Sequence, residues 1–149
     1  MSEKSALPFA RSFRDLIVYQ RQRELARQVF EVTKSFPPEE RYALTDQFRR
    51  TSRSIGAQIA EAWAKRDYER HFASKLNDAE AEQQETEHWI ETALDSGYIE
   101  TNLQDRLLGL CAEIGRMLHS MQNRAADFCA TTSRLREDDS ADFAPPTKH

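Results

Sequence analysis

No proline interrupts this chain between residues 39 and 144. Proline breaks helices and is excluded from most strand positions, so its absence from so long a stretch strongly favours uninterrupted helices. Glycine is also scarce, with four in 149 residues, and clusters of β-branched residues are few. The sequence therefore predicts long helices and no sheet. The prolines flank this stretch, at Pro8, Pro37, Pro38, Pro145 and Pro146.

Apolar residues recur at intervals of three and four, the period of a helix with one buried face. We expect four helices, over about 12–34, 38–65, 67–96 and 101–130. Local signals mark their ends: capping boxes at Ser12/Asp15 and Thr101/Gln104, an N-cap at Asp67, and a left-handed stop at Gly97. The core-facing residues of the four helices are expected to be Val18, Leu25, Val29, Val32 and Phe36; Leu44, Phe48, Thr51, Ile55, Ile59 and Ala62; Phe72, Leu76, Ala79, Gln83, Thr86, Ile90 and Ala93; and Leu103, Leu107, Leu110, Ile114, Met117, Met121 and Phe128.

Helices of similar length with short connections pack as an antiparallel bundle. The predicted fold is all-α, an up-down-up-down four-helix bundle over residues 13–130. Residues 1–12 read as a flexible N-terminal arm. Residues 131–149 are polar and acidic, end near Pro-Pro, and read as a disordered tail.

The charge of the chain is unevenly distributed. Residues 1–70 carry a net charge of +4 and residues 71–149 one of −8, which gives −4 for the whole. This balance excludes a globally basic nucleic-acid binder but leaves room for a basic face. Cys111 and Cys129 would lie roughly 27 Å apart on one helix, too far for a disulfide. Free cysteines, no signal peptide and no membrane-length apolar run predict a cytoplasmic protein.

Catalytic motifs are missing from the sequence. Four isolated glycines cannot form a phosphate-binding loop, and both cysteines read as core residues. Glu85 and His88 have the spacing of two metal ligands on one helical face, but a dimetal bundle needs a second such motif and two further inward glutamates. We therefore expect no enzyme, cofactor or metal. A metal-binding bundle enzyme is the remotest alternative.

The second predicted helix carries more than one patterned face. Beside its apolar stripe runs a polar one: Gln47, Arg50, Ser54, Gln58 and Glu61. We interpret this stripe as a network that fixes helix register or subunit contact, or else as ordinary surface. Gly56 in mid-helix costs about 1 kcal/mol relative to alanine, which indicates that another backbone approaches closely there.

Basic residues also concentrate on and after this helix. Arg49, Arg53, Lys65 and Arg66 are candidates for phosphate contact, because guanidinium groups bind phosphate oxygens in pairs. No aromatic residues for base stacking interleave with them. Pairing with the acidic third helix of another subunit explains the same residues, and both interpretations stay open.

Several segments resemble one known family: F13-R14-D15-L16 with Y19-Q20, then E24-L25-A26, F36-P37-x-x-E40, Q47-x-R49-R50, S54-I55 and I59-A60-E61, followed by G97-Y98-I99 and R116-M117-L118. The chain resembles, over about residues 13–122, the bacterial four-helix-bundle family encoded by intervening sequences in large-subunit ribosomal RNA genes. That family includes accessory proteins of diversity-generating retroelements. The chain departs from the family pattern at Gly56, Gln58, Ala62 and Thr86, which stand where proline, asparagine, glycine and leucine are usual.

The resemblance implies a cytosolic homopentamer without enzymatic activity. It also implies, from the retroelement members, contact with reverse transcriptase and nucleic acid through a basic surface. We therefore expect a homo-oligomeric accessory or scaffold protein associated with RNA or a ribonucleoprotein. The alternative is a pure protein–protein scaffold without nucleic-acid contact.

Overall fold

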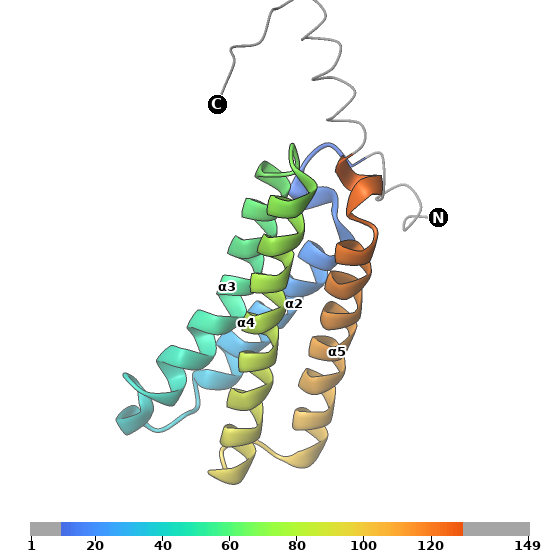
Figure 1. Ribbon diagram of the computed structural model, residues 1–149. Helices are drawn as coiled ribbons and strands as arrows, with labels where there is room; N and C mark the ends of the chain where they lie inside the picture. Colours follow the sequence, from blue (N-terminus) through green and yellow to red (C-terminus); the bar gives the residue numbers. More distant parts are fainter. Residues whose placement is uncertain (1–9, 130–149) are drawn as a thin grey trace, which may run out of the picture.

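The computed structural model describes residues 10–129, and these fold entirely into helices (Figure 1). The predicted tail, and all but residues 10–12 of the predicted arm, lie outside the described residues. Four long α-helices are joined by short connections, one of which contains a 3₁₀ turn, and a second 3₁₀ turn precedes the first long helix. In chain order the elements are η1 Phe13–Asp15, α2 Ile17–Thr33, η2 Pro38–Glu40, α3 Leu44–Ala64, α4 Glu69–Asp95 and α5 Thr101–Asn123, followed by a helical turn at 125–129.

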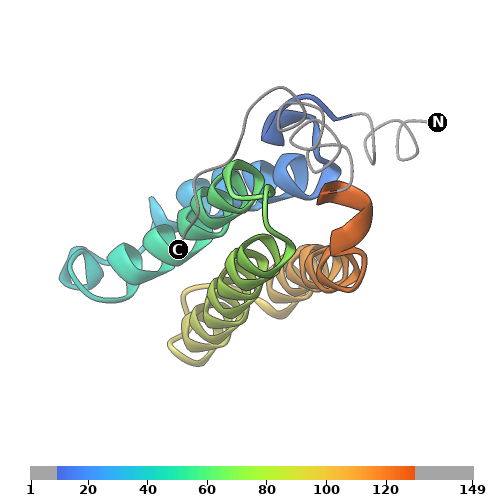
Figure 2. The same cartoon turned by 45° about the horizontal axis from the view of Figure 1, so that its top comes forward.

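The four long helices form an antiparallel bundle, as predicted. α2 packs on α3, α3 on α4, α4 on α5, and α5 back on α2. The α2–α3 and α4–α5 connections lie at one end and the α3–α4 connection at the other (Figure 1). Figure 2 turns the molecule so that the end with the α3–α4 connection comes forward. In this view α2 and α3 form one layer, and α4 and α5 form the other. Over the residues described, no helix is both long and apolar enough to span a bilayer.

The first helix begins later than predicted. Ser12 and Asp15 do form a capping box, but it caps the short turn η1 and not an α-helix. Leu16 then adopts an extended conformation, with φ −74° and ψ 132°, and α2 starts at Ile17. The interruption places the Leu16 side chain in the core, where it is buried. Core burial therefore overrides the local helix signal here.

The second helix also begins later, at Leu44 and not at Pro38. Pro38 starts a 3₁₀ turn, and Glu40 at its end reaches in two directions. One carboxylate oxygen accepts the Leu44 backbone N–H at 3.3 Å, and the other accepts the Tyr98 hydroxyl at 2.8 Å. The bond to Glu40 raises the pKa of Tyr98 above its usual value. Glu40 thus ties the start of α3 to the α4–α5 connection.

The ends of the last two helices are partly as predicted. Gly97 has φ +79°, and the N–H groups of Gly97 and Tyr98 bond to the carbonyls of Leu94 and Ala93, which is a Schellman stop. Asp67 and Thr101 are not the N-caps that the sequence predicted. Tyr68 is the N-cap of α4 and Glu100 that of α5, and neither side chain forms a capping hydrogen bond. Packing of the helices, more than capping, therefore sets where α4 and α5 begin.

The predicted core residues of α3 and α4 are all buried. The prediction for α5 is partly wrong, because Cys111 and Leu118 are buried whereas Leu103, Leu110 and Met117 are half-buried against the core. In α2, likewise, Val32 is only half-buried. Burial and the charge of Glu87 raise the pKa of Cys111 to about 12, so its thiol is protonated near neutrality. Burial is likewise the main cause that raises the pKa of Cys129 to about 11.

A glutamine lies against a glycine at each of two helix contacts. Gln22 of α2 packs on Gly56 of α3, where a Cβ would collide with its amide oxygen, and Gln22 Nε2 donates to the Ser52 carbonyl at 2.8 Å. Gln83 of α4 packs on Gly115 of α5. The expected backbone approach at Gly56 is therefore wrong: a buried side chain, and not a backbone, occupies the space.

We predict that Gly56→Ala destabilises the fold although alanine favours helices. The new Cβ would displace the Gln22 amide and break its bond to α3, which costs about 1–3 kcal/mol for a buried polar group. Equilibrium denaturation measures the change in the free energy of unfolding.

Gly109→Ala is the matched control. Gly109 is exposed on α5, and a Cβ there would meet nothing within 4 Å. This variant should gain up to about 1 kcal/mol from helix propensity. Equal stabilisation by both substitutions would contradict the assigned role of Gln22.

Candidate interaction surfaces of α3

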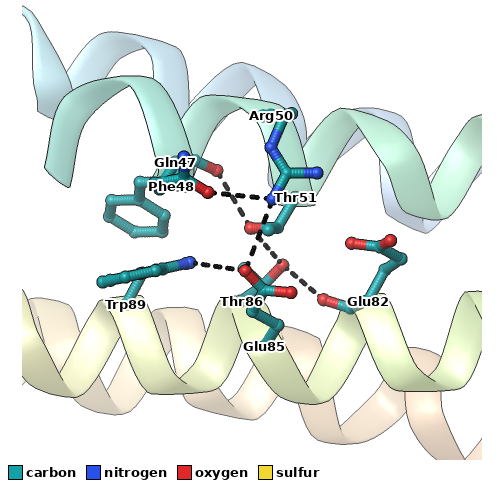
Figure 3. A network of polar contacts seen from close by, with 8 residues as sticks. All are labelled: Gln47, Phe48, Arg50, Thr51, Glu82, Glu85, Thr86 and Trp89. Carbon is teal, nitrogen blue, oxygen red and sulfur yellow. Dashed lines mark hydrogen bonds and ion pairs between the residues drawn. The ribbon is translucent and has the colours of Figure 1, made fainter. Parts of the chain in front are cut away.

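The predicted polar stripe of α3 faces α4, where part of it forms a network (Figure 3). Arg50 Nη2 donates to Gln47 Oε1 at 2.8 Å within α3 and reaches Glu85 Oε2 of α4 at 3.5 Å. The same Glu85 oxygen accepts the Trp89 indole N–H at 3.2 Å. The Arg50 and Glu85 side chains are about half and two-fifths exposed, so this pair contributes at most about 1 kcal/mol.

Beneath this network lies a fully buried pair of hydroxyls. The Oγ1 atoms of Thr51 and Thr86 are 3.1 Å apart, and both residues are 0% exposed. The Thr86 hydroxyl is also 2.8 Å from the Glu82 carbonyl, and the Thr51 hydroxyl 3.4 Å from the Phe48 carbonyl. Because a buried hydroxyl without a partner is costly, this pair favours one register of α3 against α4.

The other end of the polar stripe pairs with α4 as well. Glu61 bonds to Lys75 at 3.0 Å, and Lys75 also meets Asp78 at 3.4 Å. The bond to Glu61 raises the pKa of Lys75. Ser54 and Gln58 lie half-buried between the two ends. The stripe therefore follows the α3–α4 seam within one chain, and its use as a subunit contact stays a prediction.

On the α2 side of α3, three cations surround one aromatic ring. The Phe30 ring centroid is 4.6 Å from the Arg49 guanidinium carbon, 5.7 Å from that of Arg53 and 4.9 Å from the Lys34 ammonium. Arg49 Nε also donates to the Thr33 hydroxyl at 2.7 Å. These contacts place the guanidinium groups of Arg49 and Arg53 against one ring, an attraction of about 0.5–1 kcal/mol each at exposed sites.

Two adjoining hollows, of about 620 and 670 Å³, open beside these residues, and the second also reaches Arg50 and Ser54 of the polar stripe. The first lies between α2 and α3, the second along the first half of α3, and both include Arg53 and Ala57. Their linings contain two carboxylates, Glu31 and Asp46, against six arginines. We call these arginines the arginine face: Arg23, Arg27, Arg41, Arg49, Arg50 and Arg53.

Most of the arginine face carries uncompensated charge. Within residues 10–129, Arg50 alone among the six forms an ion pair with a carboxylate. Of the predicted phosphate-contacting residues, Arg49 and Arg53 belong to this face. Lys65 and Arg66 do not line either hollow, since they follow the C-terminal end of α3, where Arg66 stacks 4.0 Å over the Trp63 ring. The structure thus divides the predicted basic cluster into two parts.

The sequence interpretation missed the contribution of α2 to this surface. Arg23, Arg27 and Phe30 lie on α2, and their spacing of four and three was the available signal. Tyr42 was missed as well: its side chain is 83% exposed in the second hollow, with the Arg41 guanidinium carbon 5.4 Å from its ring centroid. Aromatic rings therefore do accompany the arginines in space.

The residues of the metal alternative make other contacts. Glu85 is engaged with Arg50 and Trp89, and the exposed His88 ring lies edge-on to Trp89 at 4.6 Å. In the described part of the chain, no three side chains of His, Cys, Asp or Glu gather as metal ligands.

The sequence and the fold were compared with known proteins. A sequence model of the family described as "23S rRNA-intervening sequence protein" matches residues 14–120. A crystal structure from Bacteroides thetaiotaomicron, of a protein of unknown function from the S23 ribosomal protein family, is similar with 29% identity and a TM-score of 0.66. The similarity covers 72% of this chain and 96% of that one. Among curated proteins no sequence matches.

We predict that the Thr51–Thr86 pair is strongly coupled. Thr86→Val should cost about 1–3 kcal/mol, because it removes one buried hydroxyl and weakens the bonding of the other. Thr51→Val with Thr86→Val should cost less than the two single changes together, by at least about 0.5 kcal/mol. A double-mutant cycle in urea measures this coupling, and strictly additive costs would show that the hydroxyls act independently.

Proposed function

Because the chain belongs to the 23S rRNA-intervening sequence protein family, we propose that it is a cytoplasmic, non-enzymatic, homo-oligomeric accessory or scaffold protein that associates with RNA or a ribonucleoprotein. The observation that carries this proposal is the arginine face. A chain of net charge −4 concentrates six arginines around two hollows and leaves five of them without a carboxylate partner among the described residues. Such a surface suits phosphate oxygens.

The placement of Arg49 and Arg53 around Phe30 supports phosphate binding. The contacts with Phe30 bias Arg49 and Arg53 toward positions beside the hollows, which lowers the entropy that these side chains lose when they bind a ligand. Contacts of this kind position a nucleic acid without reading its bases. The expected role is therefore recognition of RNA as a charged strand, with sequence selection left to shape or to a partner.

The charge of the surface is divided between faces. α4 exposes carboxylates such as Asp78, Glu91 and Asp95, whereas the arginine face lies on α2, α3 and the connection between them. In the RNA-associated protein the arginine face stays open to RNA, so the subunits of the oligomer meet through other surfaces. A homopentamer, which the family resemblance implies, is the assembly that we propose.

The same division of charge favours a second candidate, a protein–protein scaffold without RNA. In that case the arginine face would meet the acidic side of the neighbouring copy, and Arg49 and Arg53 would be buried between subunits. The substitutions Arg49→Gln and Arg53→Gln separate the two functions. They would lower the oligomer mass in the scaffold and lower only RNA affinity in the RNA-associated protein.

We predict an oligomer in solution. Light scattering of the full chain should give roughly 87 kDa, five times the 17.3 kDa of one chain. Measurement across a dilution series separates a stable ring from weak self-association. A mass of one chain at every concentration would overturn the homo-oligomeric part of the proposal.

We predict RNA binding that depends steeply on salt. With about four phosphate contacts, affinity should fall roughly 50- to 150-fold between 50 and 200 mM NaCl, because each contact releases a counterion. Filter binding with a fragment of 23S rRNA measures this slope. Failure to bind at 50 mM NaCl would remove RNA from the proposed function and leave the scaffold.

A further inference from the structure

The arginine face combines its charges with an exposed aromatic ring. Among the described residues, two large hydrophobic side chains are exposed, Tyr42 and Tyr68. Tyr42 lines the second hollow beside Arg41, Arg49 and Arg53, and 83% of its side chain is exposed. A single exposed tyrosine is ordinary on a protein surface, but an exposed ring beside cationic groups combines a stacking face with phosphate-binding groups.

We propose that the arginine face binds single-stranded RNA in preference to duplex RNA, with an unstacked base on the Tyr42 ring; this rests on the proposed RNA association. A duplex keeps its bases stacked inside the helix, so Tyr42 would gain little from it. A single strand offers both a phosphate chain and free base faces. Base stacking on one aromatic ring then adds to the charge contacts and requires no particular sequence.

The roles within the face differ from residue to residue. Phe30 is occupied by three cations, so it positions arginines and does not receive a base. Arg27 and Arg53 line the hollow between α2 and α3, and no described carboxylate pairs with either. They are the phosphate contacts that follow from this arrangement. Tyr42 is the stacking platform, because a single guanidinium group lies beside its ring, at 5.4 Å, and the residue is largely exposed.

The size of the surface fits a short strand. The two hollows follow α3 from Thr45 to Ala60, which is about 22 Å at the rise of an α-helix. Single-strand binding modules of this scale cover roughly 4–16 nucleotides. A 12-nucleotide probe is therefore long enough to occupy the whole face.

The test is fluorescence anisotropy with a labelled 12-nucleotide single-stranded RNA and the duplex of the same sequence. The native chain should bind the single strand more tightly. Tyr42→Ala should weaken this binding roughly 5- to 150-fold, the range for loss of one stacked base. Tyr42→Phe should keep it, because the ring remains. Tyr68→Ala is the matched control, an exposed tyrosine that lines neither hollow, and should change nothing.

A salt titration tests the phosphate contacts separately. Arg27→Gln and Arg53→Gln should each reduce the slope of log affinity against log salt by about 0.7, the value for one contact on a single strand. Arg106→Gln is the control, an exposed arginine of α5 outside both hollows, and should leave the slope unchanged. Light scattering of each variant checks that the oligomer is intact.

The outcomes separate this inference from the proposed function. Equal or tighter binding of the duplex, or unchanged binding by Tyr42→Ala, would overturn the single-strand inference and leave RNA association standing. No binding of either RNA would overturn both. A loss of oligomer mass in Arg27→Gln or Arg53→Gln, with native RNA affinity, would show that this face joins two copies of the chain.

Discussion

The contact of Gln22 with Gly56 is the constraint on which the surface of α3 depends. The amide of Gln22 bonds to the Ser52 carbonyl, and its oxygen occupies the space that a side chain at position 56 would need. This fixes α2 along α3 at one register. At that register Phe30 and Thr33, further along α2, meet Arg49 and Arg53. A buried polar contact thus decides where the charged groups of the surface stand.

The opposite side of α3 is held by a different balance of forces. The Arg50–Glu85 pair is charged, but both side chains are partly exposed to water, which screens their attraction. The Thr51–Thr86 contact is neutral but fully buried, so a slip of α4 would break the hydroxyl–hydroxyl bond where no water can replace it and leave each hydroxyl only the carbonyl of its own helix. Register along the α3–α4 seam therefore depends more on the threonines than on the ion pair.

The bundle could be predicted from sequence because the apolar period is long and uninterrupted. Errors fell where burial competes with local signals, as at Leu16, which leaves the helical conformation to reach the core. In α5 the prediction chose Leu110 and Met117, whereas their neighbours Cys111 and Leu118 are the buried residues. All four are apolar, so only the packing on α2 and α4 separates them. The local sequence pattern thus identifies a helix well, but it locates the ends of the helix and its exact buried face poorly.

The arginine face could be predicted only in part, for a related reason. Arg49 and Arg53 are evident on α3, but their neighbours Arg23, Arg27 and Phe30 come from α2, and no local pattern states which residues of two helices will meet.

Net charge does not reveal the arginine face either, since it sums over faces that a ligand never meets together. At physiological salt the field of an exposed charge is largely screened beyond about 8 Å. An approaching phosphate therefore responds to the arginines around it more than to the carboxylates on the far side of α4. The net negative charge of the chain limits non-specific attraction to polyanions, while the electrostatic potential at the arginine face stays positive.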